Sequence, residues 1–196
     1  MGDYKNGLMS GERAIELDSM FVLGIYNLGQ NYQYRGNLIK ANELYLRAIN
    51  IDSSFSDAYF RLGSNYFLDK DYEQAVKMKK AGLDYEPNNV QELNALGYYL
   101  LQQNELEKAK NYYEKAKSIL PISEFSFQGM IEYYMYTNDL VNAEKELTFY
   151  TNKYTKDNFA LYLLASIYAQ TGRDILSCQY LERAFKAGFK DLESIL

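Results

Sequence analysis

Residues 62–66 are Leu-Gly-Ser-Asn-Tyr, and a close copy of this stretch stands 34 positions before it and 34 positions after it. The earlier copy, at 28–32, is Leu-Gly-Gln-Asn-Tyr, and the later one, at 96–100, is Leu-Gly-Tyr-Tyr-Leu. The same step joins the small residues Ala41, Ala75, Ala109 and Ala143, and it joins the only two prolines, Pro87 and Pro121. A step that is kept in several registers without an insertion indicates an internal repeat.

Each repeat contains two helical patterns separated by a break. In the first pattern, apolar residues recur at helical spacing, as at Leu93, Leu96 and Leu100. The break consists of turn and N-cap residues such as Gly36-Asn37. A small residue in each pattern lets the two helices cross closely. Because a single hairpin cannot bury its own apolar face, the sequence predicts an all-α solenoid of stacked hairpins.

The repeat sets the predicted domain layout. We expect a partial repeat helix in residues 1–21, five 34-residue units at 22–55, 56–89, 90–123, 124–157 and 158–191, and the start of a truncated C-terminal helix at 192–196. Within the units, helices are predicted at 23–35, 38–51, 57–69, 71–84, 91–103, 105–118, 125–137, 139–152, 159–171 and 173–186. Residues 4–17 align with a second helix that lacks a first, so we expect a fragment of a longer protein.

These units resemble the tetratricopeptide repeat. The resemblance rests on the 34-residue length, on Leu-Gly-x-x-Tyr in the first helix, and on Ala, an aromatic residue and Ala in the second. In the first unit the residues that match this pattern are Leu28, Gly29, Tyr32, Ala41, Tyr45 and Ala48, and later units have counterparts of them. Pro87 and Pro121 follow the second helices of the second and third units. The resemblance covers residues 22–191 and implies a right-handed α-α superhelix that binds a protein or peptide.

Two units depart from this pattern. The fourth has Ile131 in place of the glycine and Tyr150 in place of a small residue, so we expect its hairpin to open or tilt and to be the least regular part of the stack. The second has Lys79 in place of the aromatic residue and Gly82 in place of alanine, which we interpret as ordinary drift within the repeat.

Composition argues against several classes of function. The formal net charge is −5 and basic residues form no patch, so nucleic acid and membrane are not expected as partners. Histidine is absent and Cys178 is the only cysteine, so neither a metal site nor another cofactor is predicted. The sequence has no catalytic motif, and the chain is predicted not to be an enzyme. The start lacks the features of a signal peptide, which favours a cytoplasmic location.

The concave face formed by the first helices is the predicted binding groove. Amides beside aromatic rings suit a bound peptide, since amides bond its backbone and rings pack against its side chains. The candidate groove residues are Tyr26, Asn27, Gln30, Phe60, Arg61, Gln91, Asn94, Tyr98, Gln128, Glu132 and Tyr162. Arg61 and Glu132 would give the groove a charge gradient that orients a peptide with one acidic and one basic end.

The sequence leaves two functions in competition. One is a scaffold or adaptor that binds a protein segment in the concave groove, and the other is a sensor or regulatory segment of a larger signalling or transcriptional protein. A chaperone tail of the Glu-Glu-Val-Asp type is not expected as the partner. The family's two-carboxylate clamp uses three cations. The equivalent positions here are Tyr26, Gln30, Arg61, Gln91 and Ala95, and only Arg61 is a cation.

Overall fold

The computed structural model of the chain describes residues 9, 11–13, 15–121 and 123–190. These residues form α-helices and no strand. The helices are α2 (Val22–Tyr34), α3 (Leu38–Ile51), α4 (Ser56–Leu68), α5 (Tyr72–Tyr85), α6 (Val90–Gln102), α7 (Leu106–Ile119), α8 (Glu124–Tyr136), α9 (Leu140–Lys153), α10 (Asn158–Gln170) and α11 (Asp174–Lys186). The ten helices predicted within the five repeat units are confirmed, with each end within one residue of its predicted position.

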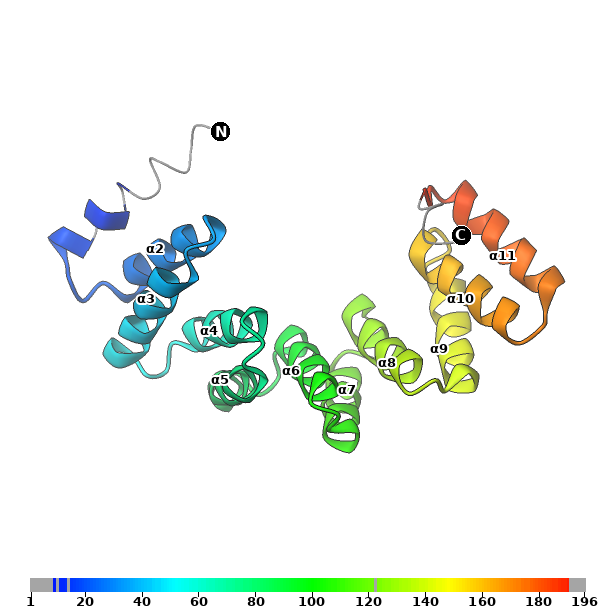
Figure 1. Cartoon of the computed structure of the whole chain (residues 1–196), viewed down its shortest axis with the longest axis horizontal. Helices are drawn as coiled ribbons and strands as arrows, with labels where there is room; N and C mark the ends of the chain where they lie inside the picture. Colours follow the sequence, from blue (N-terminus) through cyan, green and yellow to red (C-terminus); the bar gives the residue numbers. More distant parts are fainter. Residues whose placement is uncertain (1–8, 10, 14, 122, 191–196) are drawn as a thin grey trace. The chain divides into compact units, whose positions relative to one another are not determined.

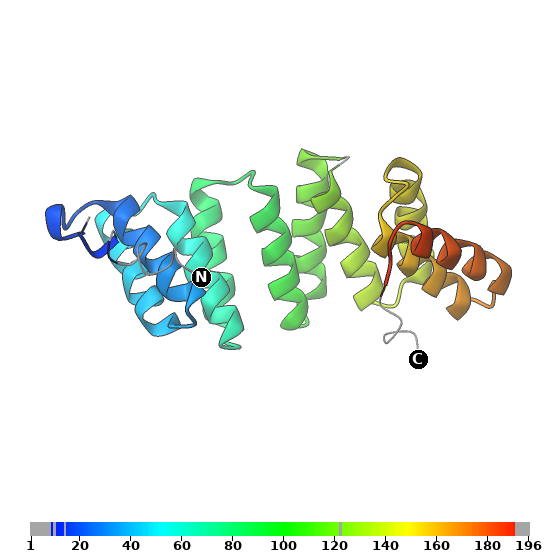
Figure 2. The ribbon, with the colours of Figure 1, turned by 90° about the horizontal axis from the view of Figure 1, so that it is seen from above.

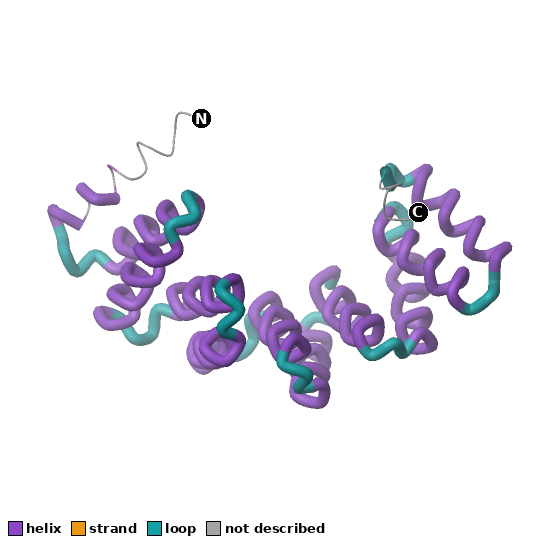
Figure 3. Tube along the Cα trace, viewed as in Figure 1, coloured by secondary structure: helices purple, strands orange, loops and turns teal. Residues whose placement is uncertain are grey.

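The chain divides into two compact units, Met1–Ile119 and Leu120–Leu196. In the N-terminal unit the hairpins are α2–α3, α4–α5 and α6–α7, and in the C-terminal unit they are α8–α9 and α10–α11 (Figure 1). Short loops join the two helices of each hairpin (Figure 3), which lie alongside each other when seen from above (Figure 2). Within each unit, successive hairpins pack through α3 on α4, α5 on α6 and α9 on α10. Both units are therefore stacked helical hairpins, as the fold class predicts.

A recurring turn explains why each first helix reverses into a second. One residue per turn has a positive φ, and these residues are again 34 apart: Gly36, Lys70, Asn104, Asn138 and Gly172. The next residue donates its N–H to a carbonyl five residues back, as Asn37 does to Tyr32 at 2.9 Å. This is the hydrogen bond that closes a helix with a left-handed residue. The Asn37 side chain then caps α3 by accepting from the Lys40 N–H.

The N-terminal unit is held by rings that fill the space over glycines. A Cβ added to Gly29 would come within 2.7 Å of the Tyr45 ring, and one added to Gly97 would come within 2.8 Å of the Tyr113 ring. Both rings are fully buried. The small residue of the second helix is buried too, and Ala109 has no exposed surface, as predicted. Close crossing at glycine and alanine is thus what packs these hairpins.

The fourth hairpin is the irregular one, as predicted. Helices α8 and α9 lie close together over less of their length than the helices of the other hairpins. Ile131 and Tyr150, which replace the usual small residues, are both buried and hold the helices apart. The Tyr150 ring packs against Phe127 and Tyr154, with ring centroids 5.1 and 4.7 Å apart.

The predicted helix at 192–196 and part of the predicted partial helix at 1–21 lie outside the described residues. Residues 11–13 and 15–17, which are described, are helical. Within the described part of the chain, every helix is too short or too polar to cross a membrane.

Candidate functional site

The first helices of the N-terminal unit bring three of the predicted residues together. The Arg61 Nε on α4 lies 3.4 Å from the hydroxyl of Tyr26 on α2, and the Gln30 amide donates to the same hydroxyl at 3.0 Å. We call these three residues the Arg61 cluster. Tyr26 is 7% exposed, so the prediction of an exposed ring there is wrong, because Phe55 packs edge-on against it at 5.2 Å.

The Arg61 cluster carries a positive charge on a half-buried guanidinium. The Arg61 Nε contacts the Tyr26 hydroxyl, Lys79 lies near enough to feel the charge of Arg61, and the carboxylate of Asp57, one turn earlier on α4, acts on Tyr26 within the same cluster. Burial raises the pKa of Tyr26, which keeps its hydroxyl neutral. The terminal nitrogens of a guanidinium held by its Nε remain able to bind a carboxylate from outside.

Phe60 is the second correction. We predicted an exposed ring, but Phe60 is 4% exposed because it occupies the space that Gly82 leaves on α5. Lys79 lies with its Nζ 5.6 Å from the ring centroids of Phe60 and of Tyr99, and it donates to the carboxylate of Glu92 on α6. Burial lowers the pKa of Lys79, and Glu92 opposes that shift. The unusual pair Lys79 and Gly82 is therefore a packed cluster, and Phe60 belongs to the core.

The remaining predicted residues of this unit differ in exposure. Asn27 and Gln91 are exposed, which agrees with a place in a groove. Tyr98 is half-buried, with its ring 5.3 Å from that of Phe67. Asn94 is half-buried and its side-chain oxygen is fully covered. A change at Asn94 would therefore disturb the protein itself as well as any ligand.

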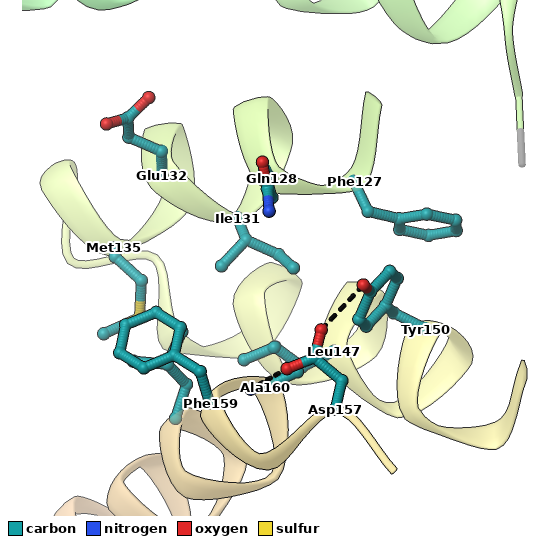
Figure 4. A pocket seen from close by; sticks show the side chains of 11 residues that line it. Phe127, Gln128, Ile131, Glu132, Met135, Leu147, Tyr150, Asp157, Phe159 and Ala160 are labelled. Atoms are coloured by element: carbon teal, nitrogen blue, oxygen red, sulfur yellow. Dashed lines mark hydrogen bonds between the residues drawn. The ribbon is translucent and has the colours of Figure 1, made fainter. Parts of the chain in front are cut away.

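The C-terminal unit contains a cavity of about 450 Å³ between α8, α9 and α10 (Figure 4). It lies where Ile131 and Tyr150 hold the fourth hairpin open. Most of its lining is aliphatic or aromatic, and the polar groups are few. Its lining residues are Phe127, Gln128, Ile131, Glu132, Met135, Leu147, Tyr150, Asp157, Phe159, Ala160 and Leu163. We call it the α8–α10 pocket.

Asp157 fixes one wall of the α8–α10 pocket. Its carboxylate accepts the Ala160 N–H at 3.0 Å as the N-cap of α10, and it accepts the Tyr150 hydroxyl at 2.8 Å (Figure 4). Burial, followed by this hydrogen bond to Asp157, raises the pKa of Tyr150. Tyr150 therefore stays a neutral donor, and the ring is held against Phe127 while the rest of the cavity stays open.

Two of the three predicted residues of this unit reach the pocket. Gln128 and Glu132 are exposed and line it from α8 (Figure 4). Tyr162 does not, because its ring stacks on Phe189 at 4.4 Å on another side of α10. Our sequence reasoning missed Met135 and the other apolar lining residues. The substitutions at 131 and 150 were the signal for a gap, but they gave no indication of which side chains would line it.

Metal chemistry finds no support in the geometry: among the described residues, no group of three or more acidic, cysteine or histidine side chains could hold a metal ion.

A family model for the tetratricopeptide repeat matches residues 56–89, 93–121 and 160–187. These segments fall in the second, third and fifth hairpins. The first and the fourth hairpins lie outside the matched segments.

Known proteins with a similar sequence or a similar fold include a subunit of a large complex and two solved proteins described as tetratricopeptide repeat proteins. Anaphase-promoting complex subunit 7 of Homo sapiens is 25% identical over 142 residues, which are 72% of this chain, and the chain spans about a quarter of that protein's length. The structure of YrrB, described as a TPR protein with an unusual peptide-binding site, has a TM-score of 0.70 at 19% identity, covering 94% of this chain and 95% of its own. A tetratricopeptide repeat protein from Parabacteroides merdae has a TM-score of 0.82 at 17% identity, covering 96% and 75%.

Proposed function

This chain is built from tetratricopeptide repeats, and we propose that it is a protein–protein interaction scaffold that binds a segment of another protein along its first helices. Repeats of this kind generally serve as scaffolds that are not enzymes. The proposal goes further by assigning the contact to the face of the first helices and by naming the Arg61 cluster as its anchor in the N-terminal unit.

The observation that carries the proposal is the charge of the Arg61 cluster. A half-buried guanidinium is costly unless a partner compensates it. The contact that the structure gives Arg61 is the neutral hydroxyl of Tyr26, with the Asp57 carboxylate one turn away on the same helix. A carboxylate on a bound segment would supply the missing charge through paired N–H donors. The exposed amide of Gln91 on α6 is available to the backbone of the same segment.

The likeness to YrrB supports a peptide as the ligand, because that protein is described as having an unusual peptide-binding site. The likeness to a subunit of the anaphase-promoting complex supports a protein partner. A large assembly needs surfaces that hold protein segments in defined places, and stacked hairpins provide extended ones.

The test is a selection of peptides from a random displayed library on the full chain, followed by titration of the selected peptides. Arg61→Gln should weaken the binding of peptides that carry a carboxylate by roughly 1–2 kcal/mol. Lys77→Gln is the matched control, because it removes the same charge from an exposed position on the second helix α5. The proposal fails if the selected peptides bind Arg61→Gln as tightly as wild type while Lys77→Gln abolishes binding.

A further inference from the structure

The α8–α10 pocket is an opening that the regular repeat does not have. In the third hairpin, Gly97 receives the Tyr113 ring and leaves little room between the helices. The corresponding residues of the fourth hairpin are Ile131 and Leu147, and they line a cavity in place of a ring-on-glycine contact. Cavities of about 300–1,000 Å³ are the size that ligand sites occupy, and this one has about 450 Å³.

The pocket's interior suits an apolar side chain. Leu147 is fully buried, and Met135 and Leu163 are partly buried, so the lining is formed by groups that gain from losing contact with water. Met135 adds an unbranched side chain that can adapt to the shape of an occupant. Phe159 stands at the edge with 58% of its surface exposed, and an inserted side chain would cover part of that surface.

The charges at the pocket's edge are negative. Glu132 lines it from α8 and Asp157 from the start of α10, and none of the eleven lining residues is a cation. A neighbouring hollow that shares Tyr150 and Asp157 adds Glu124 and one cation, Lys156. Together the two hollows are lined by three acids and one cation, and this composition favours a positively charged group beside an inserted side chain.

We propose that the α8–α10 pocket takes an apolar side chain of a partner protein that is flanked by lysine or arginine, so that the apolar group fills the cavity and the cation lies against Glu132 and Asp157. This rests on the proposed function and names the chemistry of the segment that the C-terminal unit binds. It assigns the pocket a preference opposite in charge to that of the Arg61 cluster.

The test uses the full chain labelled with ¹³C at its methionine methyl groups. The chain has six methionines, and the Met135 signal is assigned by its loss in Met135→Leu. The probe is the capped peptide Gly-Ser-Lys-Phe-Lys-Ser-Gly. Two control peptides are compared with it: one carries Glu in place of both Lys residues, and the other carries Ser in place of Phe. We expect the signal of the Met135 methyl group to shift in a saturable way as the probe is added, and both control peptides to bind at least about tenfold more weakly.

Two variants locate the contact. Glu132→Gln should weaken the binding of the probe about threefold, as expected for one solvent-exposed charge pair. Phe159→Ala should weaken the binding of the probe about fivefold, because it removes apolar contact. Glu182→Gln is the matched control, since it removes the same charge from an exposed position on α11 outside the pocket. Both variants that should weaken binding change exposed side chains, which leaves the core intact.

Several outcomes would overturn the inference. The first is a Met135 signal that does not shift at about 10 mM probe, a concentration at which even very weak binding is detected. The second is a Glu-containing control peptide that binds as tightly as the probe, which would contradict the charge preference. The third is a Ser-containing control peptide that binds as tightly as the probe, which would contradict the role of the apolar side chain. The fourth is a Met135 signal that shifts with protein concentration alone, which would identify a second copy of the chain as the occupant. If the probe fails while carboxylate peptides still depend on Arg61, this inference falls and the proposed function stands.

Discussion

Replacing Gly82 by alanine should destabilise this protein, although alanine is the better helix former. Gly82 lies inside α5, where the exchange alone would add roughly 1 kcal/mol of stability. The structure gives the opposite sign. The new Cβ would lie 2.4 and 2.6 Å from two atoms of the Phe60 ring, which is closer than carbon atoms approach in folded proteins.

The magnitude depends on whether the Phe60 ring can move. The ring is 4% exposed and has the ammonium group of Lys79 5.6 Å from its centroid, so it has little free space. Overpacking of a tight core costs roughly 1–3 kcal/mol. Subtracting the gain of about 1 kcal/mol in helix propensity leaves an expected net loss of up to about 2 kcal/mol.

The assay is urea unfolding of the full chain, with amide exchange in α4 and α5 to assign the change to this hairpin. A double-mutant cycle with Phe60→Leu supplies the control. In that background the ring is gone, so Gly82→Ala should become stabilising by roughly 0.5–1 kcal/mol. The reasoning is refuted if Gly82→Ala raises the stability of the wild-type chain, or if the two substitutions are additive.

Three more outcomes follow from the packing. Lys70→Gly should stabilise the chain by roughly 0.5–1 kcal/mol in urea unfolding, because Lys70 has a φ of 63°, whereas the same change at Asn104, a residue type that tolerates this conformation, should have a smaller effect. Ala109→Leu should cost roughly 1–3 kcal/mol, since Ala109 is fully buried, and an unchanged unfolding midpoint would contradict the repeat frame. Glu144 accepts two hydrogen bonds from Arg173, which lower its pKa, so this contribution to stability is present above the carboxylate's ordinary pKa of 4.5 and is lost as pH falls through its lowered value. Glu144→Gln should therefore cost at most about 1 kcal/mol at pH 7, since solvent screens this partly exposed pair, and the cost should shrink as pH falls through the lowered pKa of Glu144. A difference that does not depend on pH would rule out the ion pair as its cause.

The sequence predicted the helices well because the repeat supplies the same evidence several times. A single glycine such as Gly29 is weak evidence of a helix crossing, but its recurrence at Gly63 and Gly97 fixes the register of each helix. The hairpin turns could be predicted for the same reason, because the turn residues recur at the same step of the repeat. Even Lys70, which is not a turn residue by type, adopts a positive φ because its neighbours in the repeat require it.

The site was harder to predict, because exposure depends on what packs opposite each residue. Phe60 was placed in the groove from its position on α4, and only the missing side chain of Gly82, on another helix, explains why it turns inward. Tyr26 is buried in a similar way by Phe55, which lies in the loop before the next hairpin. Gln128 and Glu132 are exposed, as their predicted positions on α8 require.

The ion pair between Lys79 and Glu92 restricts how this chain can evolve. It joins the second helix of one hairpin to the first helix of the next, so neither hairpin contains the whole pair. The positions equivalent to Glu92 are Gly24, Ala58, Ser126 and Ala160, none of which could compensate a buried ammonium group. A duplication or exchange that separated these two hairpins would leave a charge inside the protein without its partner. The second and third repeats must therefore be inherited together, although each has the length and outline of an interchangeable module.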